Sequence, residues 1–539
     1  MMRIDILHSK VVKDISDCSV LLLIVWTIAS FIHNNYINDR SPTWGILHND
    51  YVTKVILTAL VYYVGRTCFS INFKWSKILV YLIMCSMALR ELLFCLLQYI
   101  HGNGTLTGSI GNTGLLGGFI SVCLSILVAD IVKKGCYMRL FLLLPLFALL
   151  ISSFSRAAWL SCAIVFLILC LKIEPMRQWM SRWKVPLLLF VLGMGIIVYS
   201  LKKESADSRL FMTMLILKNS NKLGLLGVGP GNYCGFYGRS LYVFYLNKEC
   251  VLKADPIENI EALTSERIRT GLPDCAYNEL LRTLVETGFG GAVILLIVTL
   301  LPFFKLHESK DSLSYGFLAL IIFSQFSFPS MIPLFCCLFA LFLAAGSSIQ
   351  DIKETKTIEP HLVVCSFMAV VTFSYISVVR RGVNVYNGLN NMKVFYNQGL
   401  YDEAAKEGDS LYDREYNSPK FFLDYGKILG ETKDFTDSDR VLNQGLEMSA
   451  SPDFWKALGD NSVRKGDYLM AENQYQHSFI MLPNRMQPLL DLARLYHLTG
   501  DTVKLSRIND CASRMTPKVE NDRTIRIRKE ISALAGAKR

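Results

Sequence analysis

The stretch "LFLLLPLFALLISSFSRAAWLSCAIVFLILCLK" (residues 140–172) decides the fold. Two apolar runs flank a short polar segment, 152–156, that ends in a single arginine, Arg156. A helix needs about 20 apolar residues to cross a hydrocarbon layer roughly 30 Å thick. The runs therefore predict two membrane helices joined by a tight connection. An arginine at the edge of a membrane-buried stretch is costly unless a partner neutralises it, so Arg156 marks a candidate binding position.

Similar apolar blocks fill the chain as far as residue 380. Of the 539 residues, 52% are hydrophobic and 19% are charged, and the mean hydropathy is +0.34. This composition excludes a soluble protein of this length. The first block is expected to remain as an anchor, because no cleavable signal peptide precedes it. The blocks predict about eleven membrane spans, near 18–34, 51–68, 77–98, 114–132, 138–154, 157–173, 184–201, 283–304, 313–329, 331–346 and 361–380.

The basic residues are concentrated in alternate loops. The loops "IVKKGCYMR" (131–139) and "KIEPMRQWMSRWK" (172–184) are rich in lysine and arginine, whereas "QYIHGNGTLTGSIGNTG" (98–114) has neither. By the positive-inside rule, this pattern places the N-terminus in the cytoplasm. Arg156, a long loop at 202–282 and everything after residue 380 then lie on the outer face. The net charge of +11 is assigned to this orientation signal and not to nucleic-acid binding.

The sequence after residue 380 repeats with a period of about 34 residues. Glycine or aspartate, an aromatic residue and a small residue recur in this order, and a proline closes most units. Such a period is typical of tetratricopeptide repeats, in which stacked helical hairpins share one core. The alternative is a purely structural cap. The equivalent segments are "GLYDEA" (399–404), "DFTDSD" (434–439), "GDYLMA" (466–471) and "GDTVKL" (500–505).

The fold class predicted from these features is all-α. Residues 1–380 form a polytopic helical membrane domain with the large external loop 202–282, and residues 381–539 form an α-solenoid of tetratricopeptide-like repeats. Such solenoids commonly bind a protein segment, so a protein partner is expected at the repeats.

Polar residues near the predicted outer face suggest an anion site. Arg156 and Arg209 could hold phosphate oxygens, since guanidinium is always charged and matches them in bidentate fashion. The glycine-rich segment 223–233 could bring backbone N–H groups to the same ligand. Each feature also has a structural explanation, because an arginine at a helix end often extends to lipid headgroups and a glycine-rich stretch is often only a turn. The members of this segment expected at the site are Gly227, Gly229, Gly231 and Asn232.

The cysteines and histidines indicate no metal centre. Most of the 15 cysteines lie inside apolar blocks, where they act as small hydrophobic residues. No C-x-x-C pair or histidine cluster has metal-ligand spacing. Cys234, Cys250 and Cys275 share the long loop, and a disulfide between two of them is an open alternative.

Taken in order, several segments resemble the O-antigen ligase and O-antigen polymerase superfamily of bacterial envelope glycosyltransferases. The resemblance covers most of the membrane domain and depends on the set of motifs, not on any single one. The similar segments are "LLQYIHGNGTLTGSIGNTG" (96–114), with Gln98 and Asn112, "SRAAWL" (155–160), "SRLFM" (208–212) with "LLGVGPGNY" (225–233), "AYNELLRTLVETGFGG" (276–291) and "FSQFSFPSMIPLF" (323–335).

The resemblance implies a donor glycan attached to polyprenyl pyrophosphate and transferred to an acceptor hydroxyl at the outer face of the bacterial inner membrane. Arg156 and Arg209 would then bind the pyrophosphate and stabilise the charge that develops on it. No cofactor and no metal are implied. The acceptor stays open between a lipid A core, a growing glycan and a protein, which correspond to a ligase, a polymerase and a protein O-oligosaccharyltransferase.

One position departs from the family pattern. The family has histidine before asparagine, and this chain has Tyr277 before Asn278. A tyrosine, with an ordinary pKa near 10, is a poor general base at neutral pH. Tyr277 could therefore only position the acceptor, Glu279 or Asp274 could be the base, or the attack could need little base assistance. A catalytically inactive relative is a further alternative.

Other charged residues lie within the predicted spans. Glu286 could pair with an arginine or be a structural carboxylate at a helix entry. Arg90 and Glu91 are adjacent, and since neighbouring residues do not face each other on a helix, each is expected to have its own partner.

Two different classes of protein compete with the transferase. A polysaccharide transporter or flippase would show internal repeats and charges at the bilayer midplane, and neither is evident. A membrane scaffold would not need about eleven spans as an anchor. The ligase-like transferase is therefore the first hypothesis.

Overall fold

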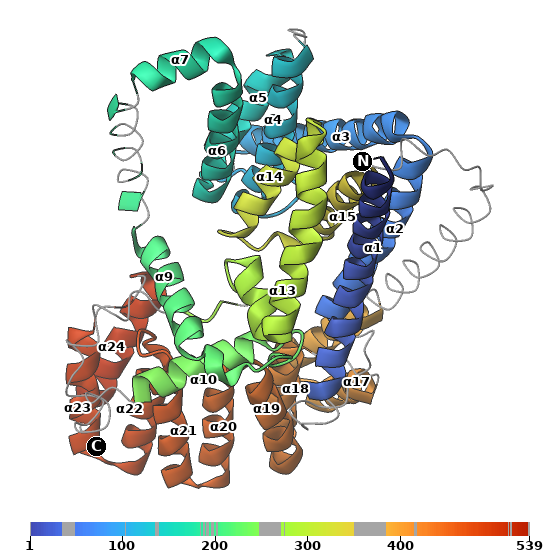
Figure 1. The fold of residues 1–539 in the computed structure, drawn as a ribbon. Helices are drawn as coiled ribbons and strands as arrows, with labels where there is room; N and C mark the ends of the chain where they lie inside the picture. The colour runs from blue at the N-terminus through green and yellow to red at the C-terminus, as the bar shows by residue number, and fades with distance from the viewer. Residues whose placement is uncertain are drawn as a thin grey trace. The chain divides into compact units, whose positions relative to one another are not determined.

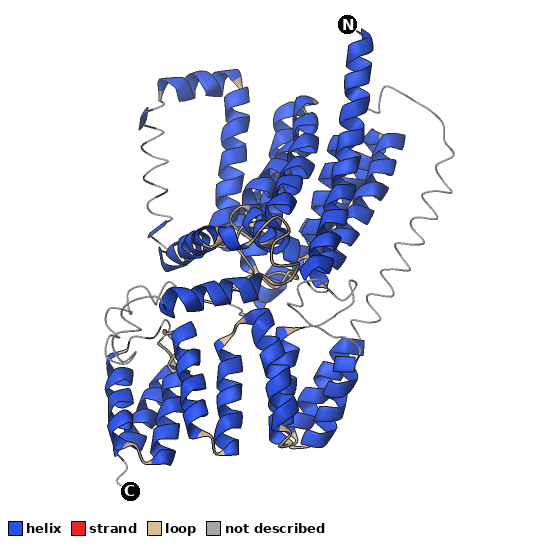
Figure 2. Ribbon diagram, turned by 60° about the horizontal axis from the view of Figure 1, so that its bottom comes forward, coloured by secondary structure: helices blue, strands red, loops and turns tan. Residues whose placement is uncertain are grey.

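The computed structural model describes residues 2–34, 49–134 except 103, 140–183, scattered positions between 185 and 200, 203–246, 271–349 except 274, 384–413, and 418–536 except 516, 518 and 519. Within these residues every regular element is a helix, and no strand is present (Figure 2). The chain divides into two units, which comprise residues 1–29, 51–201 and 276–376, and residues 30–50, 202–275 and 377–539.

The first unit contains the apolar helices. Figure 1 labels them along the chain, and the same labels are used below. They are α1 (Met2–Ile32), α2 (Asp50–Ile71), α3 (Phe73–Ile100), α4 (Thr113–Lys134), α5 (Leu140–Ser152), α6 (Arg156–Lys172), α7 (Glu174–Arg182), α13 (Glu279–Glu308), α14 (Leu313–Ser324), the short 3₁₀ helix η5 (Pro329–Met331) and α15 (Pro333–Ser348).

Five of these helices, α1, α2, α3, α4 and α13, are long and apolar enough to cross a membrane. The pair α6 and α7, bent by 105°, adds a sixth candidate, and α5, α14 and α15 are shorter apolar helices. The chain is therefore a membrane protein by the length and composition of its helices, but the expected count of about eleven spans is not confirmed. The span expected at 361–380 lies outside the described residues, as does most of the span expected at 184–201.

The core of the first unit lies between α4, α6 and α14, which pack against one another, while α13 packs against α15. The helices approach one another closely where small residues lie between them. Gly118 of α4 faces the ring of Phe323, and a Cβ there would lie 2.3 Å from ring atoms. Asn72, Ser155 and Asn278 begin α3, α6 and α13, and each side chain accepts a hydrogen bond from a backbone N–H of the first turn.

Helix α13 is kinked at Gly288, whose backbone has φ 75° and ψ −172°. Glycine adopts this conformation without the steric cost that other residues incur. The indole Nε1 of Trp26 donates to the carbonyl of Thr287 at 3.0 Å. Gly290 lies against the same indole, where a Cβ would come within 2.0 Å of ring carbon. Within the segment "TGFGG" (287–291), Gly288 thus permits the kink and Gly290 leaves space for the indole of Trp26.

The second unit contains shorter helices, several of them amphipathic. They are α9 (Lys203–Lys218), the short 3₁₀ helix η4 (Ser220–Lys222), α10 (Tyr233–Leu246), α17 (Tyr401–Asp413), α18 (Pro419–Glu431), α19 (Phe435–Ser449), α20 (Pro452–Lys465), α21 (Tyr468–Met481), α22 (Gln487–Thr499), α23 (Thr502–Arg514) and α24 (Asp522–Gly536), and residues 384–397 are also helical. Successive helices pack as pairs, α18 with α19, α20 with α21, and α22 with α23.

The repeated segments 434–439, 466–471 and 500–505 each begin in the turn within one of these pairs and continue into its second helix. Gly466 and Gly500 end α20 and α22 with φ of 81° and 78°, and Asp467 and Asp501 then begin the next helices as N-caps. The small residues Ala404, Ser438 and Ala471 are fully buried. The pattern that suggested repeats therefore specifies tight helix–turn–helix connections with close packing.

Helix α10, from the long loop, packs against α19 and α21 of the same unit. A Cβ on Gly235 would lie 2.7 Å from the carbonyl oxygen of Glu447, so only glycine fits this contact. Arg239 donates to that carbonyl at 2.7 Å, and the Tyr242 hydroxyl lies 2.5 Å from Nδ1 of His477. Helices α9 and α10 consequently group with the C-terminal helices, whereas the sequence predicted the loop 202–282 as part of the membrane domain.

Candidate functional site

The first unit encloses a cavity of about 190 Å³ between α1, α2, α13, α14 and α15. Most of its wall is apolar and includes Leu23, Ala59 and Phe339. Where α2 and α13 begin and α14 ends, the lining becomes polar. The polar lining residues there are Tyr51, Lys54, Glu279, Arg282, Thr283, Ser324, Gln325 and Ser330. This polar end is the candidate functional site.

The start of α13 positions the first carboxylate of the site. Asn278 is the N-cap: its Oδ1 accepts from the N–H of Leu281 at 2.8 Å, and its Nδ2 donates to the carbonyl of Gln325 at 3.1 Å. Glu279, the first helical residue, accepts from the N–H of Ser330 at 2.8 Å and from its hydroxyl at 2.7 Å. Two contacts to one residue fix the carboxylate against η5.

Arg282 lies one turn further along α13 and contacts the same serine. Its Nη1 donates to the Ser330 hydroxyl at 3.0 Å, and its Nε donates to Glu286 at 3.2 Å. The guanidinium lies over the ring of Tyr51, 5.0 Å from its centroid. Arg282 and Glu286 are 5% and 1% exposed. A buried ion pair of this kind contributes little net stability, so its presence in a membrane helix favours a functional role.

A second cation reaches the site from α2. Lys54 Nζ donates to the carbonyl of Met331 at 3.0 Å. The segment between α14 and α15 is thus held by Asn278, Glu279, Arg282 and Lys54, which belong to two different helices.

These contacts suit the site to two chemical roles, proton acceptance and anion binding. Glu279 accepts a proton-bearing hydroxyl at hydrogen-bonding distance, which is the geometry required of a general base. Lys54 and Arg282 supply two positive charges that can hold an anion, next to the carboxylates of Glu279 and Glu286, which carry the opposite charge.

Some of the residues expected from the sequence meet here. Asn278, Glu279 and Glu286 lie on the first two turns of α13, and Glu286 pairs with an arginine, Arg282. Tyr277 precedes the helix, and its ring meets that of Phe328 edge to face at 5.3 Å. Asp274 and Cys250 lie outside the described residues.

The two expected phosphate-binding arginines belong to different units. Arg156 is the first residue of α6 and Arg209 lies in the middle of α9. Their joint action stays a prediction. Cys234 and Cys275 are not joined to each other by a disulfide.

The glycine-rich segment forms a partly buried loop in the second unit, with residues 227–230 buried and Gly231 exposed. Gly227, Gly229 and Gly231 have φ of 70°, 98° and 83°, and their neighbours' carbonyls accept side-chain hydrogen bonds. The donors are Ser30 to Leu226, Asn232 to Val228 and Asn49 to Pro230. The glycines therefore serve a tight packed turn, and the contacts that hold this turn come from the protein itself.

Gln98 and Asn112 organise the segment between α3 and α4. Gln98 Oε1 accepts from the N–H groups of Thr107 and Gly108, both at 3.0 Å. Asn112 accepts from the N–H of Leu115 at 3.1 Å. Both side chains therefore hold the backbone of the connection between α3 and α4 in place.

The expectation that Arg90 and Glu91 have separate partners is wrong. Arg90 Nη2 donates to Glu91 at 2.9 Å, because its long side chain folds back over the neighbouring residue. Glu91, which is fully buried, also accepts from the N–H of Ser109 at 2.8 Å and from its hydroxyl.

Sequence reasoning missed Arg282, Lys54 and Ser330. A signal for Arg282 exists, because it follows Glu279 by three residues and precedes Glu286 by four, so all three share one helix face. Ser330 lies 51 residues after Glu279, and no local pattern joins them. No family model and no curated protein matches this chain. Similarity to known proteins therefore does not assign it to a family.

Proposed function

We propose that the protein transfers a glycan from polyprenyl pyrophosphate to an acceptor hydroxyl at the outer face of the bacterial inner membrane, in the manner of O-antigen ligases. The observation that supports this best is the Ser330 hydroxyl, held between the carboxylate of Glu279 and the guanidinium of Arg282 beside an apolar cavity. A carboxylate, a hydroxyl and a cation at the edge of an apolar chamber are the groups that this reaction requires.

In the proposed reaction the acceptor hydroxyl takes the place of the Ser330 hydroxyl on Glu279. Glu279 accepts its proton as the oxygen forms a bond to the anomeric carbon of the donor sugar. The bond between that carbon and the phosphate oxygen breaks, and its electron pair leaves with the pyrophosphate. Arg282 and Lys54 neutralise this leaving group, with Arg156 and Arg209 as further proposed contacts. Tyr277 positions the acceptor.

The same proposal includes the finer architecture. Membrane spans beyond those that qualify by length would bring the total to about eleven, and the loop 202–282 and the C-terminal helices would be periplasmic. The paired helices of the second unit would be tetratricopeptide repeats that dock a protein partner or a protein acceptor. A glycan-chain polymerase or a protein O-oligosaccharyltransferase would use the same chemistry, and the acceptor distinguishes them.

The experiment is complementation of a deletion strain, with lipopolysaccharide banding, secreted polysaccharide, glycoprotein and lipid-linked glycan measured together. Glu279→Gln, Arg282→Lys, Arg156→Ala and Arg209→Ala are expected to fail and to accumulate lipid-linked glycan. Tyr277→Phe is expected to retain function. Glu308→Gln, at the other, exposed end of α13, is the matched control for Glu279 and should complement fully.

The missing product identifies the acceptor. Full complementation by Glu279→Gln and Arg282→Lys, at wild-type protein levels, would refute the proposed chemistry.

A further inference from the structure

The cavity of the first unit is elongated along α2. Its lining residues on that helix recur on one face from Tyr51 to Tyr62. At 1.5 Å per residue this face is about 16 Å long. The residues between these two tyrosines that line the cavity, apart from Lys54, include Val55, Thr58 and Ala59. A chamber of this form fits a chain and not a compact headgroup.

Charged groups lie at both ends of the chamber. At the first end Lys54 donates to the Met331 carbonyl, and Arg282 donates to the Ser330 hydroxyl and to the carboxylate of Glu286. A phosphate would be a stronger acceptor than the carbonyl or the hydroxyl, because its oxygens carry formal charge. The body beyond them is apolar, so burying an alkyl or isoprenoid chain there is favourable by about 0.8 kcal/mol for each methylene group.

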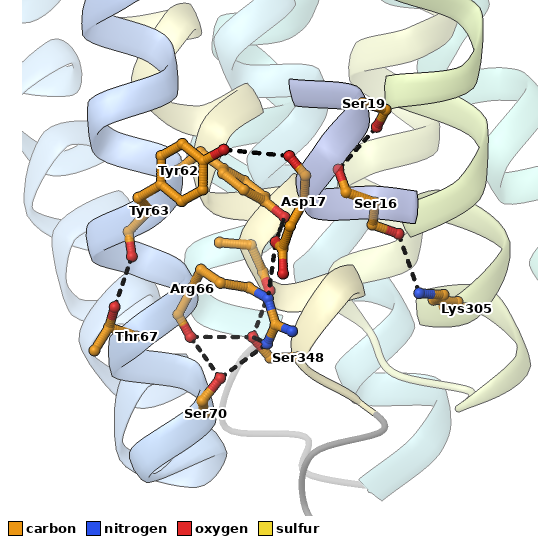
Figure 3. A network of polar contacts seen from close by, with 11 residues as sticks. Ser16, Asp17, Ser19, Tyr62, Tyr63, Arg66, Thr67, Ser70, Lys305 and Ser348 are labelled. Carbon is orange, nitrogen blue, oxygen red and sulfur yellow. Dashed lines mark hydrogen bonds and ion pairs between the residues drawn. The ribbon is translucent and has the colours of Figure 1, made fainter. Parts of the chain in front are cut away.

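Tyr62 ends the chamber at the opposite side. It is fully buried, and its hydroxyl donates to Asp17 at 2.5 Å. Arg66 donates to the same carboxylate at 3.3 Å and to Ser348 at 3.0 Å (Figure 3). Figure 3 also shows Lys305 of α13 donating to Ser16 of α1. The floor is therefore a polar network that joins α1, α2, α13 and α15, and an apolar chain would not displace it.

Two residues that line the cavity also reach the outer surface of α13. Leu296 and Leu300 of α13 line the cavity and are also 41% and 38% exposed. The part of a long chain that does not fit could leave between helices at this side and continue in the bilayer.

We propose that the cavity is a length-limited pocket for the head-proximal part of an anionic lipid chain, with the phosphate at Lys54 and Arg282 and Tyr62 as the floor. This inference rests on the proposed function, which supplies the pyrophosphate-linked donor, and specifies which part of the donor the protein recognises. The pocket contacts the lipid chain only as far as Tyr62, so a short chain and a long chain should bind with similar affinity.

Direct binding to the purified full-length protein in detergent tests this inference. The probes are farnesyl pyrophosphate, undecaprenyl pyrophosphate, farnesol and inorganic pyrophosphate. The two lipid pyrophosphates should bind within about threefold of each other, and farnesol and pyrophosphate should each bind at least about tenfold more weakly, which is a difference of about 1.4 kcal/mol.

The variant Ala59→Phe fills the chamber about 12 Å along α2 from Tyr51, in the part nearer the Tyr62 floor, and should weaken both lipid pyrophosphates by about tenfold or more. Val25→Phe is the matched control, because Val25 lies on α1 next to the lining residue Ile24 and is itself 53% exposed. It should bind both probes like the wild type. Both variants should elute as folded protein in size-exclusion chromatography.

A tenfold preference for the undecaprenyl probe over the farnesyl probe would overturn the length limit. Unchanged binding by folded Ala59→Phe would overturn the pocket itself. If instead the binding results are as expected while Glu279→Gln and Arg282→Lys still complement the deletion strain, the pocket stands and the proposed transfer chemistry fails, so the two outcomes are distinguishable.

Discussion

Asp491 of α22 should make the second unit less stable as pH rises from about 4 to about 6. The side chain is 4% exposed, and Oδ2 has no hydrogen-bond partner, while Gln487 donates to Oδ1 at 3.0 Å. Burial raises the pKa of this carboxyl from 3.8 to about 6, with Asp460 adding to the rise and Lys456, 3.8 Å away, opposing it. The folded state thus holds the proton more tightly than the unfolded state.

The direction and the size of this change in stability follow from the difference in pKa between the folded and unfolded states. Well below pH 3.8 the carboxyl is protonated in both states and has no effect on stability. Between pH 4 and 6 only the unfolded state ionises, so stability falls, and above pH 6 the loss is constant. At 1.36 kcal/mol per pKa unit, a shift of about two units amounts to about 3 kcal/mol. Asp491→Asn cannot ionise, so its stability relative to the wild type should rise by about 2 kcal/mol between pH 4 and pH 7.

Hydrogen exchange of peptides from α20 and α22 in the full-length protein measures this change. Exchange rates are corrected for intrinsic pH dependence, and wild type and variant are compared at each pH. Any constant effect of the amide cancels in this comparison. Asp510→Asn, an exposed acid on α23, should give no pH-dependent difference. A flat difference between Asp491→Asn and wild type from pH 4 to pH 7 would refute the reasoning.

Three further substitutions test the packing. Gly235→Leu should detach α10 from α19, because its side chain meets the Glu447 carbonyl, and trypsin should then cleave after Arg239; Gly536→Leu, in open space, is the control. Gly108→Ala should cost about 2 kcal/mol more than Gly102→Ala in thermal unfolding, since both residues have positive φ but only Gly108 lies against Glu91. Trp26→Phe should cost about 1 to 3 kcal/mol, because the Thr287 carbonyl at the kink loses its donor, and equal melting of variant and wild type would contradict this role.

The helical character and the turns could be predicted from the sequence because both depend on local pattern. Apolar blocks of span length and the recurring Gly-Asp pairs at 466–467 and 500–501 specify their structure within a few residues. The number of spans could not be predicted in this way, because α5, α14 and α15 are apolar but too short to qualify by length alone.

The candidate site was predictable only in part. Asn278 and Glu279 belong to one motif, and their position at the start of α13 agrees with it. The contact of Glu279 with Ser330 joins segments distant in sequence, and Lys54 comes from a third. The ion pair of the exposed Arg90 with the buried Glu91 shows a different limit, since the geometry of a helix does not fix where a long flexible side chain ends.

The kink at Gly288 has a mechanical consequence for the site. It separates the first turns of α13, which bear Glu279, Arg282 and Glu286, from its second half, which packs against α15 and lines the cavity. A break of this kind lets the two segments of a helix take different directions. Trp26 of α1 donates to the Thr287 carbonyl just before the break and packs against Gly290 just after it, so α1 fixes the angle between the candidate site and the rest of α13.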